Sequence, residues 1–160
     1  MGGVSVRAKV NPMDSTIKRA TQIFQDFLKG RNLKVTGERK IILDAVFKTH
    51  DHFDVEELYK TIQDLNHRVS KATIYRTLEL FVECGLVNKL SLGDSFSRYE
   101  HIYGHEHHDH LICVSCGKII EFFNEDLEKL QDKICRDHNF KETDHSLRIF
   151  GHCEDCAGSG

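Results

Sequence analysis

The 160-residue sequence has no long hydrophobic run, no low-complexity segment, no internal repeat and a single proline. No stretch reaches the roughly 18 apolar residues that span a bilayer, which excludes a membrane-spanning helix. The first residues, MGGVSVRAKVNPMDS, lack the apolar segment of an export signal, so we expect a cytoplasmic protein without a membrane partner. With 39% hydrophobic and 29% charged residues, the composition is that of a globular protein with one ordinary domain or two small ones.

Charge and metal-binding residue types are unevenly distributed along the chain. Residues 1–90 contain 15 Lys/Arg and 11 Asp/Glu, a net +4, whereas residues 91–160 contain 7 and 14, a net −7. Eight of the 11 His and five of the six Cys also lie after residue 90. A basic first half suits a polyanion such as nucleic acid, and an acidic, His-rich second half suits cations. We therefore predict a DNA-binding domain over residues 1–95 and a metal-binding domain over residues 96–160.

The first half has the pattern of helices followed by a hairpin. Apolar residues recur at helical spacing in four segments, which begin near residues 17, 37, 55 and 70. Asp54 and Glu57 have the spacing of a capping box, and Gly85 is typical of a helix end. After Gly85, short strand-like runs flank Gly93-Asp94, a hairpin signal. Helices followed by a two-stranded ribbon predict a winged helix-turn-helix.

The second half alternates between strand-like and helical segments. Strands are predicted at residues 111–113, 118–122 and 147–150, and a helix from about residue 124 to 138. This order predicts a small α/β domain. The whole chain is therefore expected to be α+β, with an N-terminal winged helix-turn-helix domain and a small C-terminal α/β domain.

Two Cys-x-x-Cys pairs lie in the second half. In a reducing cytoplasm, such pairs are more often metal ligands than disulfides. Thiolates two residues apart on a tight turn converge on one ion, and two such turns complete a tetrahedral shell around zinc. We predict a structural zinc ion bound by Cys113, Cys116, Cys153 and Cys156. A redox dithiol is disfavoured, because neither pair stands at the start of a predicted helix, where the thiol pKa would be lowered.

The segment HHDH at residues 107–110 precedes the first Cys pair. On an extended backbone, alternate side chains point to opposite faces, so His107 and Asp109 share one face and His108 and His110 the other. One segment could then supply two separate sites of nitrogen and oxygen ligands. Such ligands hold Fe²⁺, Mn²⁺, Co²⁺ or Zn²⁺ less permanently than thiolates hold zinc, as a sensor requires. A solvated polar loop is the alternative interpretation.

Three motifs together resemble one known family. They are ATIYRTLELFVECGLV at 72–87, HHDHLICVSCGKIIEF at 107–122 and HSLRIFGHCEDC at 145–156. In this order and spacing they resemble the ferric uptake regulator (Fur) family of metal-dependent bacterial repressors, over roughly residues 30–156. The resemblance implies a homodimer, with a winged helix that binds double-stranded operator DNA and a C-terminal α/β domain that dimerises. It leaves open whether dimers associate into tetramers.

The resemblance also implies a ligand set for each metal ion. The four paired Cys match a structural Zn²⁺ site. A regulatory site for Fe²⁺, with Mn²⁺, Co²⁺ or Zn²⁺ as substitutes, matches His52, Glu100, His108, His110 and Glu121. A further site inside the dimerisation domain matches His107, Asp109, Glu128 and His145. The segment EHIYGHEHHDH at 100–110 is one residue longer than the family pattern, so His101 or His105 is an alternative to Glu100.

Regulatory ligands from both halves would make the ion a bridge, and its binding would stabilise one closed arrangement. Glu121 favours iron sensing, because the resemblance implies Asp at this position in peroxide sensors. Affinity order alone favours zinc over iron at such a site, so cellular availability decides the metal. A sensor of zinc, manganese or peroxide from a sister branch remains the alternative.

The helix that begins near residue 70 is the predicted DNA-reading element. The resemblance matches Tyr75 and Arg76 to the major groove, where Arg commonly reads guanine with two hydrogen bonds. Lys71, Thr73 and Thr77 are also expected on the face away from the apolar stripe. Candidate phosphate contacts, which would set the register without reading sequence, are Ser70, Lys71, Arg39 and Lys40. The alternative is that this helix face is simply solvated. Because the net charge of the first half is only +4, we expect tight DNA binding only from a dimer that presents two such helices.

A zinc-dependent hydrolase or deaminase is the main alternative from another class. His105-Glu106-His107 resembles the H-x-E element of deaminases, whose pattern also has a proline before its Cys pair and an open position on zinc. Here the only proline is Pro12, and four thiolates would close the zinc shell. A metal-storage module would not need a winged helix. We therefore expect a regulator and not an enzyme.

Overall fold

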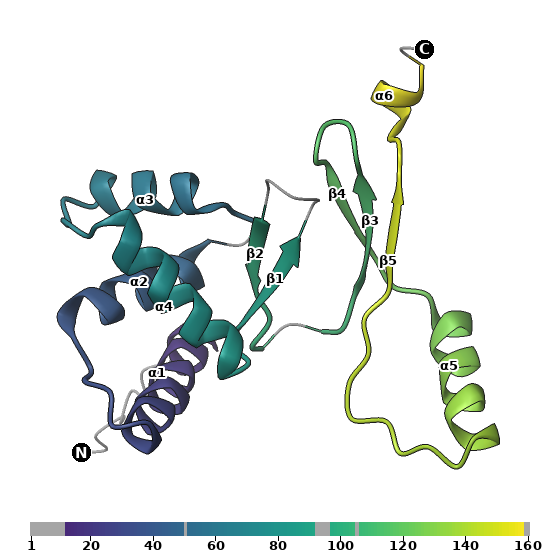
Figure 1. The fold of residues 1–160 in the computed structure, drawn as a ribbon, viewed down its shortest axis with the longest axis horizontal. Helices are drawn as coiled ribbons and strands as arrows, with labels where there is room; N and C mark the ends of the chain where they lie inside the picture. Colours follow the sequence, from purple (N-terminus) through teal and green to yellow (C-terminus); the bar gives the residue numbers. More distant parts are fainter. Residues whose placement is uncertain (1–11, 50, 92–96, 105, 159–160) are drawn as a thin grey trace, which may run out of the picture. The chain divides into compact units, whose positions relative to one another are not determined.

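The structure, a computed structural model, describes residues 12–49, 51–91, 97–104 and 106–158. The chain divides into two compact units, which are considered separately below (Figure 1). Of the described residues, 12–49, 51–91 and 97–104 belong to the first unit and 106–158 to the second. Among the described helices, none is both long enough and apolar enough to cross a bilayer.

The described part of the first unit consists of four helices followed by a two-stranded antiparallel sheet (Figure 1). These elements are α1 (Pro12–Gly30), α2 (Gly37–Lys48), α3 (Val55–Asp64), α4 (Lys71–Glu83), β1 (Val87–Ser91) and β2 (Ser97–His101). The four predicted helices are thus confirmed, although α1 begins five residues earlier than its apolar pattern. Proline suits that first helical position, since its missing N–H would have no helical partner there.

Local side chains define where α3 and α4 begin and end. Asp54 Oδ1 accepts from the Glu57 N–H at 2.8 Å, and the Asp54 N–H donates to Glu57 Oε2 at 2.9 Å, which confirms the capping box. Ser70 Oγ accepts from the Thr73 N–H at 3.1 Å and caps α4. Gly85, with φ of 73°, supplies the left-handed residue beyond the end of α4.

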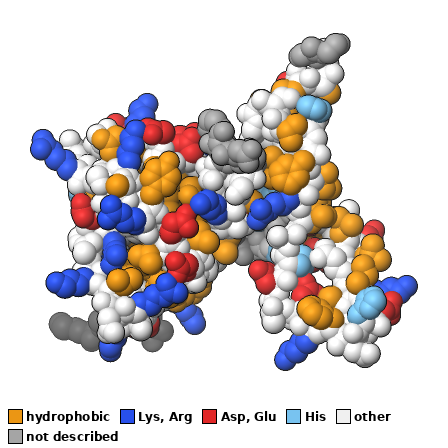
Figure 2. Space-filling view, in the orientation of Figure 1, with side chains coloured by type: hydrophobic (Ala, Val, Ile, Leu, Met, Phe, Trp, Pro, Cys, Tyr) orange, Lys and Arg blue, Asp and Glu red, His pale blue; other side chains and the backbone are white. Residues whose placement is uncertain are grey.

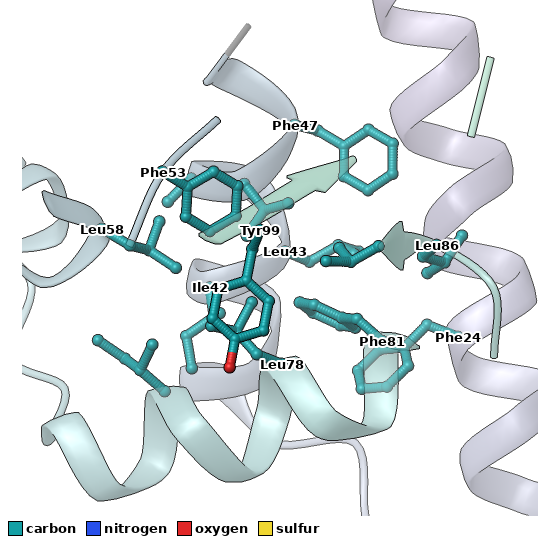
Figure 3. Packing of buried hydrophobic residues seen from close by; sticks show 14 of the residues in the cluster. Phe24, Ile42, Leu43, Phe47, Phe53, Leu58, Leu78, Phe81, Leu86 and Tyr99 are labelled. Carbon is teal, nitrogen blue, oxygen red and sulfur yellow. The ribbon is translucent and has the colours of Figure 1, made fainter. Parts of the chain in front are cut away.

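The helices and β2 enclose one hydrophobic core (Figure 3). Phe24 of α1 meets Phe81 of α4 edge to face, with ring centroids 4.6 Å apart. Phe53, just before α3, stacks on Tyr99 of β2 at 6.0 Å. The same two residues form an isolated antiparallel bridge, which ties the segment before α3 to the wing. This bridge places His52 beside β2. On α4, Leu78 and its neighbours are buried, so the opposite face of the helix is exposed.

The wing is the antiparallel pair β1–β2, with a register that runs from Val87 opposite His101 to Ser91 opposite Ser97. The predicted turn at Gly93-Asp94 lies outside the described residues. The ribbon on either side of it is confirmed.

The described part of the second unit is a three-stranded sheet with two helices (Figure 1). The sheet has the order β4-β3-β5, in which β3 pairs antiparallel with β4 and parallel with β5. Its elements are β3 (Asp109–Cys113), β4 (Ile119–Phe122), α5 (Glu125–Asp137), β5 (Arg148–Gly151) and α6 (Glu154–Ala157). The strands and α5 follow the prediction within two residues. The four-residue helix α6 was not predicted, because it is too short to show a periodicity.

Candidate metal centres and DNA-contacting helix

The parallel pairing of β3 with β5 brings the two Cys-x-x-Cys pairs together. Cys113 ends β3 opposite Gly151 of β5, so the turn after β3 lies beside the chain that leaves β5. All four Sγ atoms lie within 4.8 Å of one another, and Cys116 Sγ is 3.7 Å from Cys153 Sγ. A tetrahedral zinc ion with Zn–S bonds of about 2.3 Å separates its sulfur ligands by about 3.8 Å. The spacing of the thiols therefore fits zinc.

The protonation of the four thiols also indicates a cation. Hydrogen bonds from the backbone N–H groups of Cys153 and Cys116 lower the pKa of Cys113 to about 5. The Cys153 N–H donates to Cys113 Sγ at 3.3 Å. Hydrogen bonds with the three neighbouring thiol groups raise the pKa of Cys156 to about 12. Four thiols this close do not all ionise on their own, whereas a bound divalent ion offsets half of the charge of four thiolates and displaces their protons.

One expectation about these thiols is wrong. Neither pair was expected at a helix start, but Cys153 is the N-cap residue of α6. The redox interpretation gains little from this, because the lowered pKa belongs to Cys113, at the end of a strand. A redox dithiol needs only two sulfur atoms together. Here four converge.

A second cluster of ligand atoms forms within the second unit. His107, which precedes β3, Glu128 of α5 and His145, which precedes β5, each place one atom within 4.8 Å of the others. His107 Nε2 lies 3.5 Å from Asp109 Oδ1 and 3.7 Å from Glu128 Oε1. His145 Nε2 lies 3.2 Å from Glu128 Oε2. The structure thus brings together the four residues that the family resemblance assigned to one site.

Three buried polar atoms in this cluster make no hydrogen bond: Asp109 Oδ2, Glu128 Oε1 and His145 Nε2. Asp109 is 1% exposed, and its other oxygen accepts from the Leu147 N–H at 3.0 Å. Buried carboxylate oxygens without a partner are costly and rare. Two carboxylates and two imidazoles are a suitable donor set for a divalent ion, which would satisfy all three atoms.

Glu142 is a residue near this cluster that sequence reasoning missed. His145 Nδ1 lies 2.5 Å from Glu142 Oε1, on the side of the ring away from Nε2. Burial lowers the pKa of His145, but the hydrogen bond to Glu142 and the charges of Glu128 and Glu142 outweigh it and raise the pKa overall. A Glu three residues before a His is a common arrangement, so the sequence contained no signal that singled it out.

The predicted regulatory ligands fall into two sets, one on each unit. In the first unit, His52 Nε2 lies 3.0 Å from Glu100 Oε2, and Asn88 donates from Nδ2 to Glu100 Oε1 at 3.0 Å. In the second unit, the rings of His108 and His110 lie 5.0 Å apart, and His108 Nε2 lies 3.9 Å from Glu121 Oε1. His110 is directly opposite Glu121 in the β3–β4 register. The two faces expected for residues 107–110 are therefore separated as predicted.

Of the alternatives to Glu100, His101 follows it in β2 and packs against Phe47, with tilted rings whose centroids are 4.9 Å apart. Consecutive strand residues point to opposite faces, so His101 is directed away from the side on which Glu100 meets His52. His105 lies outside the described residues. Within the first unit, Glu100 is the acidic partner of His52.

Helix α4 presents Tyr75 and Arg76 to solvent, with Tyr75 50% exposed. The expectation that Thr77 shares this face is wrong. Thr77 is buried and donates from its hydroxyl to the Thr73 backbone oxygen at 2.7 Å. The internal hydrogen bond satisfies the hydroxyl, so a threonine can occupy the inner face of the helix.

Three of the four candidate phosphate contacts, Ser70, Lys71 and Arg39, already have intramolecular partners. Lys71 Nζ donates to both carboxylate oxygens of Glu56 at 2.6 Å. Arg39 donates to the backbone oxygen of Lys34, and Ser70 and Thr73 are engaged in the cap of α4. Ser70 and Thr73 thus position the start of the helix. Lys71 would have to leave Glu56 to reach a phosphate.

Comparison with known proteins decides the family. Residues 30–150 match the model of the ferric uptake regulator family. The chain belongs to this family. A ferric uptake regulation protein of Neisseria meningitidis is 39% identical over 135 residues, which cover 83% of this chain and 92% of that protein. One from Yersinia pestis is 43% identical over 128 residues, which cover 79% and 86%.

Solved structures of ferric uptake regulators resemble both units. The Helicobacter pylori regulator, described as having three functional metal binding sites, matches with a TM-score of 0.75 at 27% identity, over 89% of this chain and 94% of that one. The Pseudomonas aeruginosa regulator with manganese matches with a TM-score of 0.70 at 30% identity, over 81% and 97%. The family resemblance and the α+β fold class, a winged helix followed by a small α/β domain, are thereby confirmed.

Proposed function

We propose that this chain is a metal-responsive transcriptional repressor. Fe²⁺ binds the regulatory ligands and stabilises the homodimer in the arrangement that binds operator DNA. The observation that carries this proposal is the division of those ligands. The winged-helix unit contributes the His52–Glu100 pair, and the sheet unit contributes His108, His110 and Glu121. An ion that uses both sets stabilises one arrangement of the units and shifts the population toward it.

The ligand types support a reversible ion at this site and a permanent one at the thiols. Imidazole and carboxylate ligands bind Fe²⁺, Mn²⁺, Co²⁺ or Zn²⁺, while thiolates select zinc. Among the relatives, the Francisella tularensis regulator is described with iron and the Pseudomonas aeruginosa regulator with manganese. We therefore assign structural Zn²⁺ to the four Cys and Fe²⁺ to the regulatory ligands, with the other ions as substitutes. His107, Asp109, Glu128 and His145 form the additional site.

A homodimer is supported by an apolar face on the sheet of the second unit. Leu111 of β3 lies opposite Ile120 of β4 and Ile149 of β5, and the three are 37%, 42% and 47% exposed. Helix α5 has a strongly one-sided distribution of apolar residues, yet none of its residues is buried. Hydrophobic side chains are accordingly visible on the surface over this unit (Figure 2). A contiguous exposed apolar face of this kind marks an association surface, and a second copy of the chain would cover it.

The DNA-reading role is assigned to α4. Tyr75 and Arg76 lie on its outward face, where an arginine can reach guanine in the major groove. Two such helices in a dimer would occupy successive turns of the duplex. A repressor that acts on an operator works in the cytoplasm. It needs no catalytic centre, and four thiolates would leave zinc without an open position for a substrate.

The proposal is tested with the double variant His108→Ala/His110→Ala and the control His67→Ala, which removes an exposed His from the first unit. A duplex selected from a random-sequence pool by the Fe²⁺-loaded protein is titrated without oxygen, with and without Fe²⁺. We expect Fe²⁺ to tighten DNA binding by the wild type and the control but not by the double variant, which remains a dimer in size-exclusion chromatography.

Linkage provides a second measurement on the same samples. Operator DNA must tighten Fe²⁺ binding by the same factor as Fe²⁺ tightens DNA binding. Equal DNA affinity of the wild type with and without Fe²⁺ would contradict the repressor mechanism. A double variant that still responds to Fe²⁺ would show that the regulatory ligands are assigned to the wrong residues.

A further inference from the structure

Glu142 connects His145 to helix α5. The residue lies in the segment between α5 and β5. Its Oε1 is 2.5 Å from His145 Nδ1, and its Oε2 accepts from Cys135 Sγ of α5 at 3.8 Å. Burial and the charge of Glu142 raise the pKa of Cys135, so this side chain stays a thiol and can donate. The carboxylate is thereby held from two sides.

The contact with Glu142 determines which nitrogen of His145 carries the proton. An ionised carboxylate can only accept hydrogen bonds, so the proton between the two groups belongs to Nδ1 of the ring. In the neutral imidazole, the lone pair then lies on Nε2. That nitrogen is buried and belongs to the cluster with His107 and Glu128. Glu128 Oε2 lies 3.2 Å from Nε2 without forming a hydrogen bond, whereas Glu142 Oε1 lies 2.5 Å from Nδ1, so the shorter contact holds the proton on Nδ1.

We propose that Glu142 is a positioning residue of the additional metal centre: it holds the His145 proton on Nδ1 and so presents the Nε2 lone pair to the ion. A carboxylate behind a histidine ligand fixes the orientation of the ring and increases its basicity. The inference rests on the proposed metal centre at His107, Asp109, Glu128 and His145. It adds a fifth residue that does not itself contact the ion.

Glu128 cannot take over this role, because its contact with His145 is on the ligand side of the ring, at Nε2. Without an acceptor at Nδ1, the proton is free to move to Nε2, where it blocks the lone pair that the ion needs. Loss of Glu142 should therefore weaken metal binding although every ligand is still present. Outer-shell partners of this kind contribute about 10- to 100-fold in metal affinity.

The test uses three substitutions in the full chain with zinc retained at the four Cys. Glu142→Leu removes the acceptor, and Glu142→Gln keeps an acceptor oxygen without the charge. Asp144→Asn is the matched control, since it removes a charge from an exposed residue of the same segment. All three are placed in the His108→Ala/His110→Ala background, so that added Co²⁺ does not bind at those ligands. Co²⁺ affinity is measured by titration of its absorption bands.

The tautomer is measured separately, before Co²⁺ is added, from long-range proton–nitrogen correlations of the His145 ring at a pH where the imidazole is neutral. We expect an Nδ1-protonated ring in the unsubstituted chain, in Glu142→Gln and in Asp144→Asn, and loss of this preference in Glu142→Leu. Co²⁺ affinity should fall about 10- to 100-fold in Glu142→Leu, fall less in Glu142→Gln and be unchanged in the control.

The outcomes distinguish a failure of the Glu142 role from a failure of the metal centre. An Nε2-protonated ring in the unsubstituted chain overturns the role of Glu142, whether or not any variant folds. Normal Co²⁺ binding by Glu142→Leu overturns it as well. Absence of Co²⁺ binding in the parent background overturns the metal centre itself, and with it this proposal.

Discussion

Replacing Asp109 with Asn tests whether the buried cluster of the second unit is built for a cation. Asp109 is 1% exposed, its Oδ1 accepts from the Leu147 N–H at 3.0 Å, and its Oδ2 makes no hydrogen bond. Asparagine keeps an acceptor for Leu147. It replaces the unpaired anionic oxygen with a neutral amide nitrogen. Without a bound ion, the change removes an unsatisfied charge and preserves the existing contact.

The size of the expected stability change follows from this geometry. An unsatisfied buried acceptor costs about 1–3 kcal/mol, and a charged one costs more. We therefore expect Asp109→Asn to stabilise the metal-free second unit by about 1–3 kcal/mol, which slows hydrogen exchange of the β3 amides by roughly 5- to 150-fold. With excess Co²⁺, the unsubstituted protein should be more stable than the variant. The variant has lost a charged ligand, so the ion binds more weakly and adds less stability.

Hydrogen exchange of the segment around residues 109–113, read by mass spectrometry with and without Co²⁺, measures both effects. Zinc is kept at the thiolates throughout. Asp132→Asn, which neutralises an exposed carboxylate on α5, is the control and should change neither state. If Asp109→Asn destabilised the metal-free unit as much as the Co²⁺-loaded one, Asp109 would be an ordinary structural residue and the reasoning would be refuted.

Four further predictions concern the other sites. Cys116→Ser should release zinc and weaken folding or dimerisation, because three thiolates no longer close the shell; an unchanged zinc content by elemental analysis would contradict this. Arg76→Ala should reduce the preference for the selected duplex over random DNA by about 1–3 kcal/mol and leave metal affinity intact, whereas an effect on metal affinity alone would argue against the assignment of α4. Glu56→Gln should free Lys71 for a phosphate, so DNA binding should tighten and the slope of log affinity against log salt should steepen by about 1 in magnitude; an unchanged slope would show that Lys71 does not reach the DNA. Ile149→Asp should yield monomers in analytical ultracentrifugation, since it puts a charge on the apolar sheet face, and a stable dimer would place the interface elsewhere.

The helices were readable from the sequence wherever local chemistry defines them. Asp54 and Glu57 are three residues apart and satisfy each other's backbone groups, and Gly85 provides the left-handed residue after α4. The prediction for Thr77 is wrong because it follows the polar residue type and not the position on the helix. Thr77 lies three residues after Ile74 and four before Phe81, on the buried stripe of the helix, and its hydroxyl bonds within the helix.

The sequence by itself determined the family, the order of helices and strands, and the residue types that can bind a metal ion, because these depend on spacing along the chain. Only the tertiary structure decided which ligands meet. The parallel pairing of β3 with β5 brings Cys113 to Cys153, and the return from α5 to β5 brings Glu128 to His145. Contacts between residues distant in sequence depend on how the strands pair and how the connecting segments fold back, and no local periodicity records either.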